Sequence, residues 1–150
     1  MTEIQALLLI KSILESADIH GIEHILSEDC EYMSTGRGII GRNRNESIEF
    51  LSSMTESIKA DNVPVTCKVM HITDVYEEDA LFHEGRHGLT VSYESGDNYV
   101  YMIFVDVNDE GLVDRIVSSQ ENYSIEYDDL RFGDDEREYA FISAPTTVKD

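Results

Sequence analysis

The run from Leu26 to Phe50, LSEDCEYMSTGRGIIGRNRNESIEF, constrains the fold more than any other part of this chain. It predicts a strand over residues 30–34 and, between glycines that mark tight turns, a short return strand at Ile39-Ile40. A helix start follows directly, because Asn43 is a favourable N-cap residue and Glu46 stands three positions later. A hairpin that leads straight into a helix indicates a chain that mixes helices and strands.

Helical patterns dominate the first part of the chain. Residues 2–5 match a capping box, and apolar residues then recur at helical spacing until Asp18 and Gly21 interrupt the pattern. Residues 22–26 predict a short second helix that ends in the polar Ser27-Glu28-Asp29. The helix that begins after Asn43 is the third, and we expect it to end before Pro64.

From Val65 onward the apolar pattern has a period of two, which is typical of strands. Polar and glycine-containing turns separate four such segments, so consecutive strands should pair as an antiparallel meander. We therefore expect an α+β fold in which three N-terminal helices pack on one face of a curved antiparallel sheet. The predicted strands cover residues 65–74, 80–93, 99–107 and 112–119.

Charge excludes some classes of partner. The 150 residues include 31 acidic and 11 basic side chains, for a net charge of −20. Binding to nucleic acid through phosphates needs a basic surface, which this composition does not favour, and anionic membranes would repel such a chain. We expect no nucleic-acid and no membrane partner. A basic protein is a suitable partner, because opposite charges steer association, although plain solvation also accounts for an acidic surface.

Size and cysteine content indicate one cytoplasmic domain. The length fits a single domain, and no run of apolar residues is long enough to span a membrane. The N-terminus lacks the basic segment of a signal peptide. Cys30 and Cys67 are therefore predicted to be reduced core thiols. We expect the domain to cover residues 1–122 and to be followed by an acidic C-terminal segment, 123–150, that forms either an arm or a mobile tail.

The order of these elements, and several short motifs within them, are similar to a known superfamily. The motifs are Asp18, Ile22, Leu26–Asp29, Tyr32, Gly41-Arg42, Ile48–Leu51, Tyr101–Val105, Gly111–Val113 and Ile116. Over about the first 120 residues the chain resembles the nuclear transport factor 2-like (NTF2-like, or cystatin-like) superfamily, and most closely its SnoaL-like or ketosteroid isomerase-like branch. This resemblance implies a cone whose interior holds a small molecule, and a homodimer formed through the outer sheet face. It does not specify a reaction, because the fold hosts isomerases, dehydratases, cyclases and binding modules.

The catalytic base of the isomerases has no counterpart here. The resemblance implies an aspartate shortly before the glycine that corresponds to Gly41. Counting from Gly41 places Tyr32 at that position, and aligning on Phe50 places Ser34 there. A tyrosine with an ordinary pKa near 10 is a poor general base at neutral pH. Glu31 would point away from Tyr32 because strand side chains alternate, so we expect no isomerase chemistry of this type.

Three histidines are the candidate catalytic and ligand-binding residues. His83 and His87 lie four residues apart on one predicted strand and therefore share a face with apolar neighbours, and His71 lies in an apolar row on the preceding strand. A pocket histidine of this kind would bind or protonate a ligand, while ordinary hydrogen-bonded core histidines are the alternative. The spacing of roughly 13 Å along the strand argues against a shared metal, so we predict none.

Tyrosines and arginines are further candidates for ligand-binding residues. Tyrosines at four strand positions would either line a cavity with hydroxyls or pack across strands: Tyr32, Tyr93, Tyr99 and Tyr101. Three arginines gather around the glycine hairpin and the following helix start, where they would hold an anion or offset the acidic surface: Arg37, Arg42 and Arg44. With Ser34 and the histidines, Tyr32 and Tyr101 form the predicted ligand site.

Three functions follow from these observations. The leading hypothesis is a domain without isomerase chemistry and without a cofactor, which binds a small apolar molecule or a protein. The second is an isomerase, dehydratase or cyclase-like enzyme that acts on a small hydrophobic substrate through a pocket histidine. The third is an acidic immunity or inhibitor protein that masks a basic partner.

Overall fold

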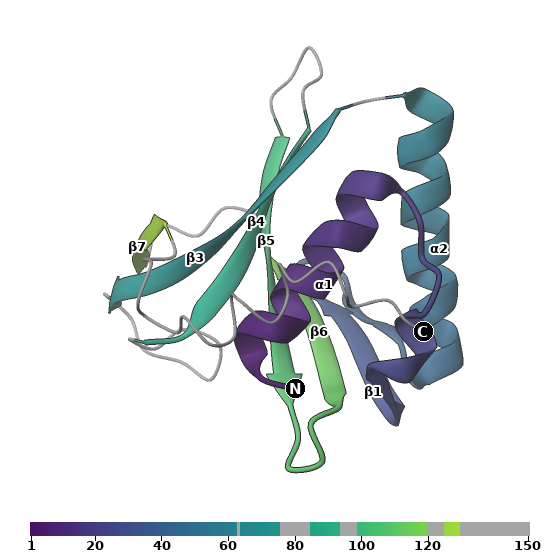
Figure 1. Ribbon diagram of the computed structural model, residues 1–150, viewed down its shortest axis with the longest axis horizontal. Coiled ribbons are helices and arrows are strands. Elements are labelled where there is room, and N and C mark those ends of the chain that lie inside the picture. The colour runs from purple at the N-terminus through teal and green to yellow at the C-terminus, as the bar shows by residue number, and fades with distance from the viewer. Residues whose placement is uncertain (63, 76–84, 94–98, 120–124, 130–150) are drawn as a thin grey trace, which may run out of the picture.

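The computed structural model describes residues 1–62, 64–75, 85–93, 99–119 and 125–129. Helices and one large sheet form two layers, with both α-helices on the same face of the sheet (Figure 1). The chain therefore has the predicted α+β architecture. In order, the elements are α1 (Glu3–Ser16), the 3-10 turn η1 (Ile22–His24), β1 (Leu26–Ser34), β2 (Gly38–Gly41), α2 (Arg44–Asp61), β3 (Val65–Val75), β4 (His87–Tyr93), β5 (Tyr99–Val107), β6 (Val113–Ser119) and β7 (Ile125–Asp129).

Both α-helices begin at the caps that the sequence predicts. At the start of α1 the Gln5 backbone N–H donates to the Thr2 hydroxyl, and the Gln5 side chain accepts from the Thr2 backbone, which completes the capping box. At the start of α2 the Glu46 N–H donates to Oδ1 of Asn43 at 2.9 Å. Asn62 ends α2 in the left-handed conformation, which asparagine tolerates better than most residues.

The prediction of three N-terminal helices is wrong at the middle one. Residues Ile22–His24 form a single 3-10 turn, so the described residues contain two α-helices. So short a segment cannot offset the cost of nucleating an α-helix. Strand pairing begins directly after this turn, because the Val113 N–H donates to the Ile25 carbonyl and Leu26 pairs with Val113. The polar residues expected to end that helix lie in β1, where Glu28 and Asp29 are exposed.

In the part of the chain that the structure describes, the sheet has seven strands in the order β2-β1-β6-β5-β4-β3-β7. Strands β3 to β6 pair antiparallel with their neighbours in sequence, which confirms the predicted meander. Strand β1 pairs parallel with β6 and so brings the β1–β2 hairpin beside the end of the meander. The part of the second predicted strand that precedes residue 85 lies outside the described residues.

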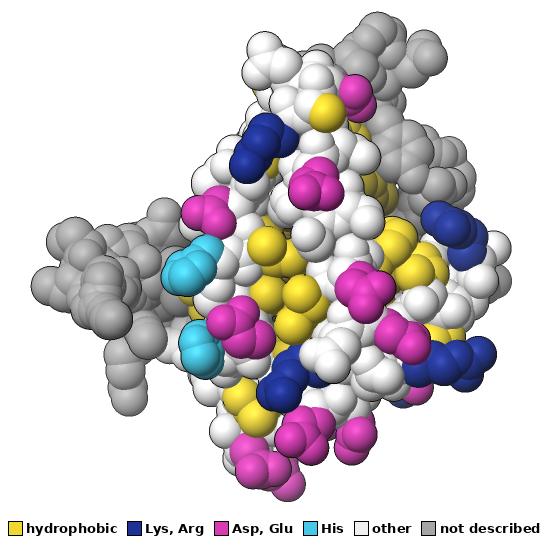
Figure 2. Space-filling model, turned by 90° about the vertical axis from the view of Figure 1, so that its right-hand side faces the viewer, with side chains coloured by type: hydrophobic (Ala, Val, Ile, Leu, Met, Phe, Trp, Pro, Cys, Tyr) yellow, Lys and Arg dark blue, Asp and Glu magenta, His cyan; other side chains and the backbone are white. Residues whose placement is uncertain are grey.

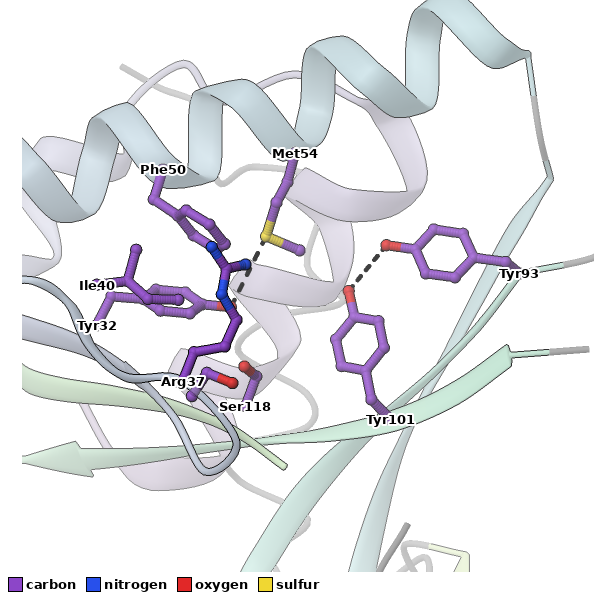
Figure 3. Close-up of a pocket in the computed structure, with 9 residues that line it drawn as sticks. Tyr32, Arg37, Ile40, Phe50, Met54, Tyr93, Tyr101 and Ser118 are labelled. Carbon is purple, nitrogen blue, oxygen red and sulfur yellow. Dashed lines mark hydrogen bonds between the residues drawn. The ribbon is translucent and has the colours of Figure 1, made fainter. Parts of the chain in front are cut away.

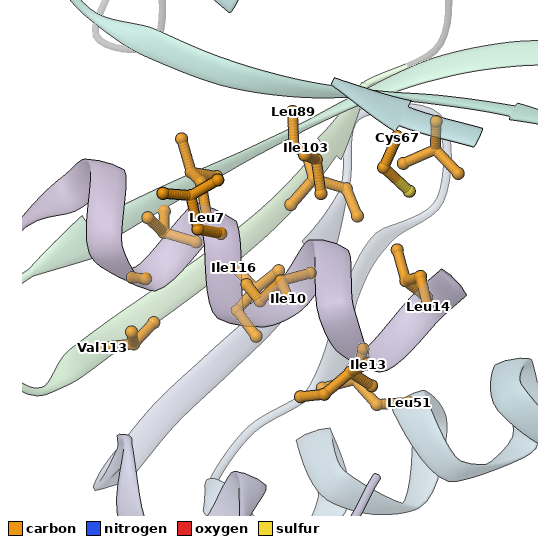
Figure 4. Packing of buried hydrophobic residues seen from close by; sticks show 14 of the residues in the cluster. Leu7, Ile10, Ile13, Leu14, Leu51, Cys67, Leu89, Ile103, Val113 and Ile116 are labelled. Carbon is orange, nitrogen blue, oxygen red and sulfur yellow. The ribbon is translucent and has the colours of Figure 1, made fainter. Parts of the chain in front are cut away.

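Buried apolar side chains fill the space between α1 and the inner sheet face (Figure 4). Helix α1 packs on β3, β4 and β5, and α2 packs on β1 and β2. Leu7, Leu14 and Leu89 are fully buried. Cys30 and Cys67 are buried, unpaired thiols, as predicted, and burial raises the pKa of each to about 12. A thiol that ionises so reluctantly is a structural residue.

The outer sheet face carries a second, smaller group of buried side chains. Ile72, Phe104 and Val117 are each 0% exposed, and Met102 is 8% exposed. In the described part of the chain this face presents no exposed apolar cluster. Dimerisation through this face, which the resemblance implies, stays a prediction.

Strand β7 is an element that the sequence did not predict. It pairs antiparallel with the edge of β3, with His71 opposite Asp128. Its residues, IEYDD, lie at the start of the segment expected to be an acidic arm or tail. Residues 130–150 lie outside the described residues. The hypothesis that an acidic tail binds a basic partner depends on them.

Acidic and basic side chains are interspersed on the face seen in Figure 2, around hydrophobic side chains near its centre. None of the described helices has both the length and the apolar character needed to cross a membrane.

Candidate small-molecule pocket

A pocket of about 200 Å³ lies between α2 and the inner face of the sheet. Its wall comes from β1, β2, α2, β4, β5 and β6 and from the turn between β1 and β2. This placement agrees with the cone interior that the resemblance implies. The lining residues are Tyr32, Ser34, Arg37, Ile40, Phe50, Met54, Tyr93, Tyr101 and Ser118.

Three tyrosines, Tyr32, Tyr93 and Tyr101, line the pocket (Figure 3). The hydroxyls of Tyr93 and Tyr101 form a hydrogen bond of 2.9 Å. The Tyr32 hydroxyl donates to the Met54 sulfur at 3.7 Å, and the Tyr32 ring packs against Phe50 with centroids 4.6 Å apart. The sequence left packing and cavity lining open for these tyrosines, and the structure combines the two. Tyr99 begins β5, but its side chain lies outside the described part of the chain.

Burial keeps these phenols protonated. Loss of solvent raises the pKa of Tyr32 to about 12, although a hydrogen bond with Ser118 acts in the opposite direction. Burial also raises the pKa of Tyr101, and neighbouring Tyr93 adds to the effect. At neutral pH both groups are hydrogen-bond donors and not bases.

Arg37 is the charged residue that the pocket lining contains. It follows β1 in a turn closed by a hydrogen bond from the Arg37 N–H to the Ser34 carbonyl, 3.2 Å long. Figure 3 shows its side chain extending across the pocket toward Phe50 and Met54. Among the described residues that line this pocket, none is acidic.

The other two arginines of the predicted anion site lie elsewhere. Arg42 and Arg44 flank the start of α2 and are not among the lining residues. Glu46 occupies this helix start, because its carboxylate accepts from the Arg42 backbone N–H at 2.9 Å. The structure thus brings only Arg37 to the pocket, and an anion site that uses all three arginines stays a prediction.

A groove of about 360 Å³ continues the pocket along α2. The two spaces share Phe50, Met54 and Tyr93. Farther along the helix the groove is lined by Ser53, Ser57, Ile58 and Asp61. Met54 and Ile58 are partly buried, and part of the apolar face of α2 thus forms one wall of this groove.

His71 and His87 pair across β3 and β4, with ring centroids 5.1 Å apart, and neither lines the pocket or its groove. His87 Nδ1 lies 3.0 Å from a carboxylate oxygen of Glu3, at the start of α1. The same carboxylate lies 3.5 Å from Nε of the buried Arg86. His83 lies outside the described residues. Within the described residues no group of three potential ligands could hold a metal ion.

Five lining residues were not predicted as site residues: Ile40, Phe50, Met54, Tyr93 and Ser118. Phe50 and Met54 are four residues apart on α2 and therefore lie on one face, but helical spacing alone does not show that this face borders a cavity. Ser118 lies opposite Ser34 in the parallel pairing of β1 with β6, which the sequence did not predict.

Glu31, the carboxylate next to Tyr32, does not line the pocket. Its side chain lies 3.7 Å from Arg115, and it is 35% exposed. The alternation of β1 therefore directs this acid away from the cavity, as predicted. What the pocket offers a ligand is an apolar wall, protonated phenols, serine hydroxyls and one guanidinium group.

Comparison with known proteins supports the fold. No family model matches the chain, and no curated protein matches it. The chain is similar to the structure of an uncharacterised protein with a cystatin-like fold from Silicibacter pomeroyi, with TM-score 0.55, 14% identity, and 81% of this chain and 78% of that chain covered.

Two further solved structures are similar. An NTF2-like protein of unknown function from Cytophaga hutchinsonii has TM-score 0.51 and 13% identity, with 79% of this chain and 98% of that chain covered. SalBIII, an epoxide hydrolase/cyclase-like enzyme with a role in pyran ring formation in salinomycin, has TM-score 0.53 and 12% identity, with 81% of this chain and 94% of that chain covered. These structural neighbours confirm the resemblance at the level of the fold, and the chain has the NTF2-like, cystatin-like fold.

Proposed function

We propose that this protein binds a small, largely apolar molecule in the pocket between α2 and the sheet, and that it does not abstract a proton from that molecule. The observation that carries the proposal is the composition of the lining. The resemblance implies a catalytic carboxylate at the position of Tyr32 or Ser34; Tyr32 is a buried phenol whose pKa is raised to about 12, and Ser34 is a hydroxyl residue of the same lining. Neither a carboxylate nor a histidine is among the described residues that line the pocket.

The size of the site supports a small ligand. Small-molecule sites are usually concave and mostly apolar, with a few polar groups that orient the ligand. The pocket and the groove that continues it have volumes of about 200 and 360 Å³. Together they fall within the usual range of a few hundred Å³ or more for such sites.

Binding of the neutral fluorescent amine N-phenylnaphthylamine tests this proposal. We expect saturable binding with one site per chain, and at least tenfold weaker binding to Ser34→Leu, whose added side chain fills the pocket. Ser12→Leu is the matched control, because Ser12 lies on the exposed side of α1, away from the pocket lining. Unfolding curves check that both variants are folded. Equal binding to both variants, or no saturable binding to the wild type, would contradict the proposal.

A further inference from the structure

We propose that the ligand is an elongated apolar carboxylic acid, held with its carboxylate at Arg37 and its apolar chain along α2. This inference rests on the proposed function and adds the chemical class and the orientation of the ligand. Its first support is the charge of the lining, in which Arg37 stands with hydroxyl groups and no described acid. A guanidinium at the mouth of an apolar site favours a carboxylate, because it donates two parallel hydrogen bonds to that group.

The second support is the neighbourhood of Arg37. In this chain of 31 acidic side chains, described carboxylates form ion pairs with Arg86 and Arg115, but, as with Arg42 and Arg44, no described residue forms one with Arg37. Its side chain instead crosses the pocket (Figure 3). The guanidinium group is therefore available to the carboxylate of a ligand in the pocket.

The third support is the set of hydroxyl donors near this end of the site. Ser34 and Ser118 lie opposite each other on β1 and β6, and both line the pocket with Tyr32. The raised pKa of Tyr32 keeps its proton on the oxygen at neutral pH. Oxygen atoms of a carboxylate accept hydrogen bonds and donate none, so donors of this kind suit it.

The elongated shape of the ligand and its orientation follow from the groove along α2. Residues 50, 54 and 58 lie on one side of α2, and the distance along the helix axis from Phe50 to Asp61 is roughly 16 Å at 1.5 Å per residue. Asp61 lines the far end of the groove. A negative group there disfavours a second carboxylate, so the acid end of the ligand belongs at Arg37 and the apolar end near Ile58.

A matched pair of probes, octanoate and octanol, tests the charge preference by calorimetric titration at fixed ionic strength. We expect the wild type to bind octanoate about tenfold more tightly than octanol, the range of a charge-assisted hydrogen bond. Arg37→Gln should weaken octanoate binding about tenfold more than octanol binding, and so remove this preference. Arg42→Gln is the control that keeps the preference, because Arg42 carries the same charge on the same hairpin outside the pocket lining.

The outcomes separate the two proposals. Equal affinity of the wild type for the acid and the alcohol, or a preference that survives in Arg37→Gln, overturns the carboxylate inference while ligand binding itself stands. Failure of the wild type to bind octanoate, octanol and N-phenylnaphthylamine overturns both proposals. Affinity should also rise from hexanoate to decanoate, because each added methylene contacts the groove. An affinity that does not change with chain length would overturn the elongated ligand.

Discussion

At the scale of single residues, Tyr32 shows how burial sets the chemistry of a pocket side chain. It is 1% exposed, pairs with Gly41 across the β1–β2 hairpin, and lines the pocket. A carboxylate at this position would be a candidate base, but a buried phenol holds its proton far above neutral pH. The residue therefore contributes shape and a hydrogen-bond donor to the site.

The raised pKa of Tyr32 predicts a loss of stability at alkaline pH. The phenol ionises at about 10 in the unfolded chain and at about 12 in the folded one. Below pH 10 both states are protonated and the stabilisation is complete. Between pH 10 and 12 the unfolded state loses its proton first, so the free energy of unfolding falls, by up to about 3 kcal/mol at 1.36 kcal/mol per pH unit.

Urea unfolding of the wild type and Tyr32→Phe at a series of pH values measures this contribution. The difference in unfolding free energy between the two proteins should be constant below pH 10 and should shrink or reverse above it. The other tyrosines are present in both proteins, so their ionisation cancels in the comparison. Parallel curves up to the highest pH would contradict the assignment.

A second residue-scale prediction concerns Gly41. A Cβ atom at this position would meet the backbone nitrogen and the Oγ of Ser47 at 2.8 Å. Ser47 is fully buried, and its hydroxyl donates to the Cys30 carbonyl at 2.9 Å, which ties α2 to β1. Gly41→Ala should therefore reduce the free energy of unfolding by about 1–3 kcal/mol, the usual cost of overpacking.

Gly36→Ala is the control for Gly41→Ala. It lies in the turn between β1 and β2, and a Cβ there would meet nothing within 4 Å. Denaturant unfolding should place Gly36→Ala within about 0.5 kcal/mol of the wild type. Similar losses in both variants would mean that crowding against Ser47 is not the cause.

At the scale of elements, α2 performs two tasks. Its packing on β1 and β2 fixes the hairpin that carries Tyr32 and Arg37, and its side chains at 50 and 54 form one wall of the pocket. The position of this helix depends on its start, where Asn43 caps the chain and Glu46 reaches back to the Arg42 backbone. Local sequence thus sets where the wall of the pocket begins.

The cap of α2 provides the element-scale prediction. Asn43→Ala removes the acceptor of the Glu46 N–H, and we expect a loss of about 1 kcal/mol in the free energy of unfolding. Asn45→Ala is the control. It makes the same change of side chain at an exposed residue inside the first turn of the same helix, where no cap is lost. Thermal or denaturant unfolding should separate the two variants. Equal stability of the two would show that the cap does not hold the helix start.

At the scale of the whole molecule, net charge opposes compactness. A charge of −20 on 150 residues produces self-repulsion in the folded chain. Described ion pairs such as Lys11 with Glu15 and Arg86 with Asp106 offset only part of it. Salt screens this repulsion, because the Debye length falls from about 30 Å at 0.01 M to about 10 Å at 0.1 M.

The stability of the protein should therefore rise with ionic strength. We expect the free energy of unfolding in urea to increase, on the order of 1 kcal/mol, between these two salt concentrations. Sodium chloride and potassium chloride should have the same effect, since the cause is screening and not binding of a particular cation. A stability that stays flat or falls with salt would show that self-repulsion is not a significant term.

Sequence and tertiary structure contributed in different ways. The sequence by itself determined the caps at Thr2 and Asn43, the meander and the buried thiols, because these depend on neighbours a few residues away or on simple alternation. It also placed Glu31 outside the pocket, since side chains on a strand must alternate. It could not exclude a short helix at 22–26, because the strand pairing that replaces it joins Leu26 to the distant Val113.

Only the tertiary structure decided which polar groups share the pocket. Tyr32, Tyr101 and Ser118 come from strands far apart in the chain, and they meet because β1 pairs in parallel with β6. His71 and His87 share the inner face, but their position along the strands places His87 beside Glu3 and His71 beside His87, away from the tyrosines of the pocket. Periodicity reports the face of a residue, whereas its distance from the site depends on strand register and helix packing, which no local pattern encodes.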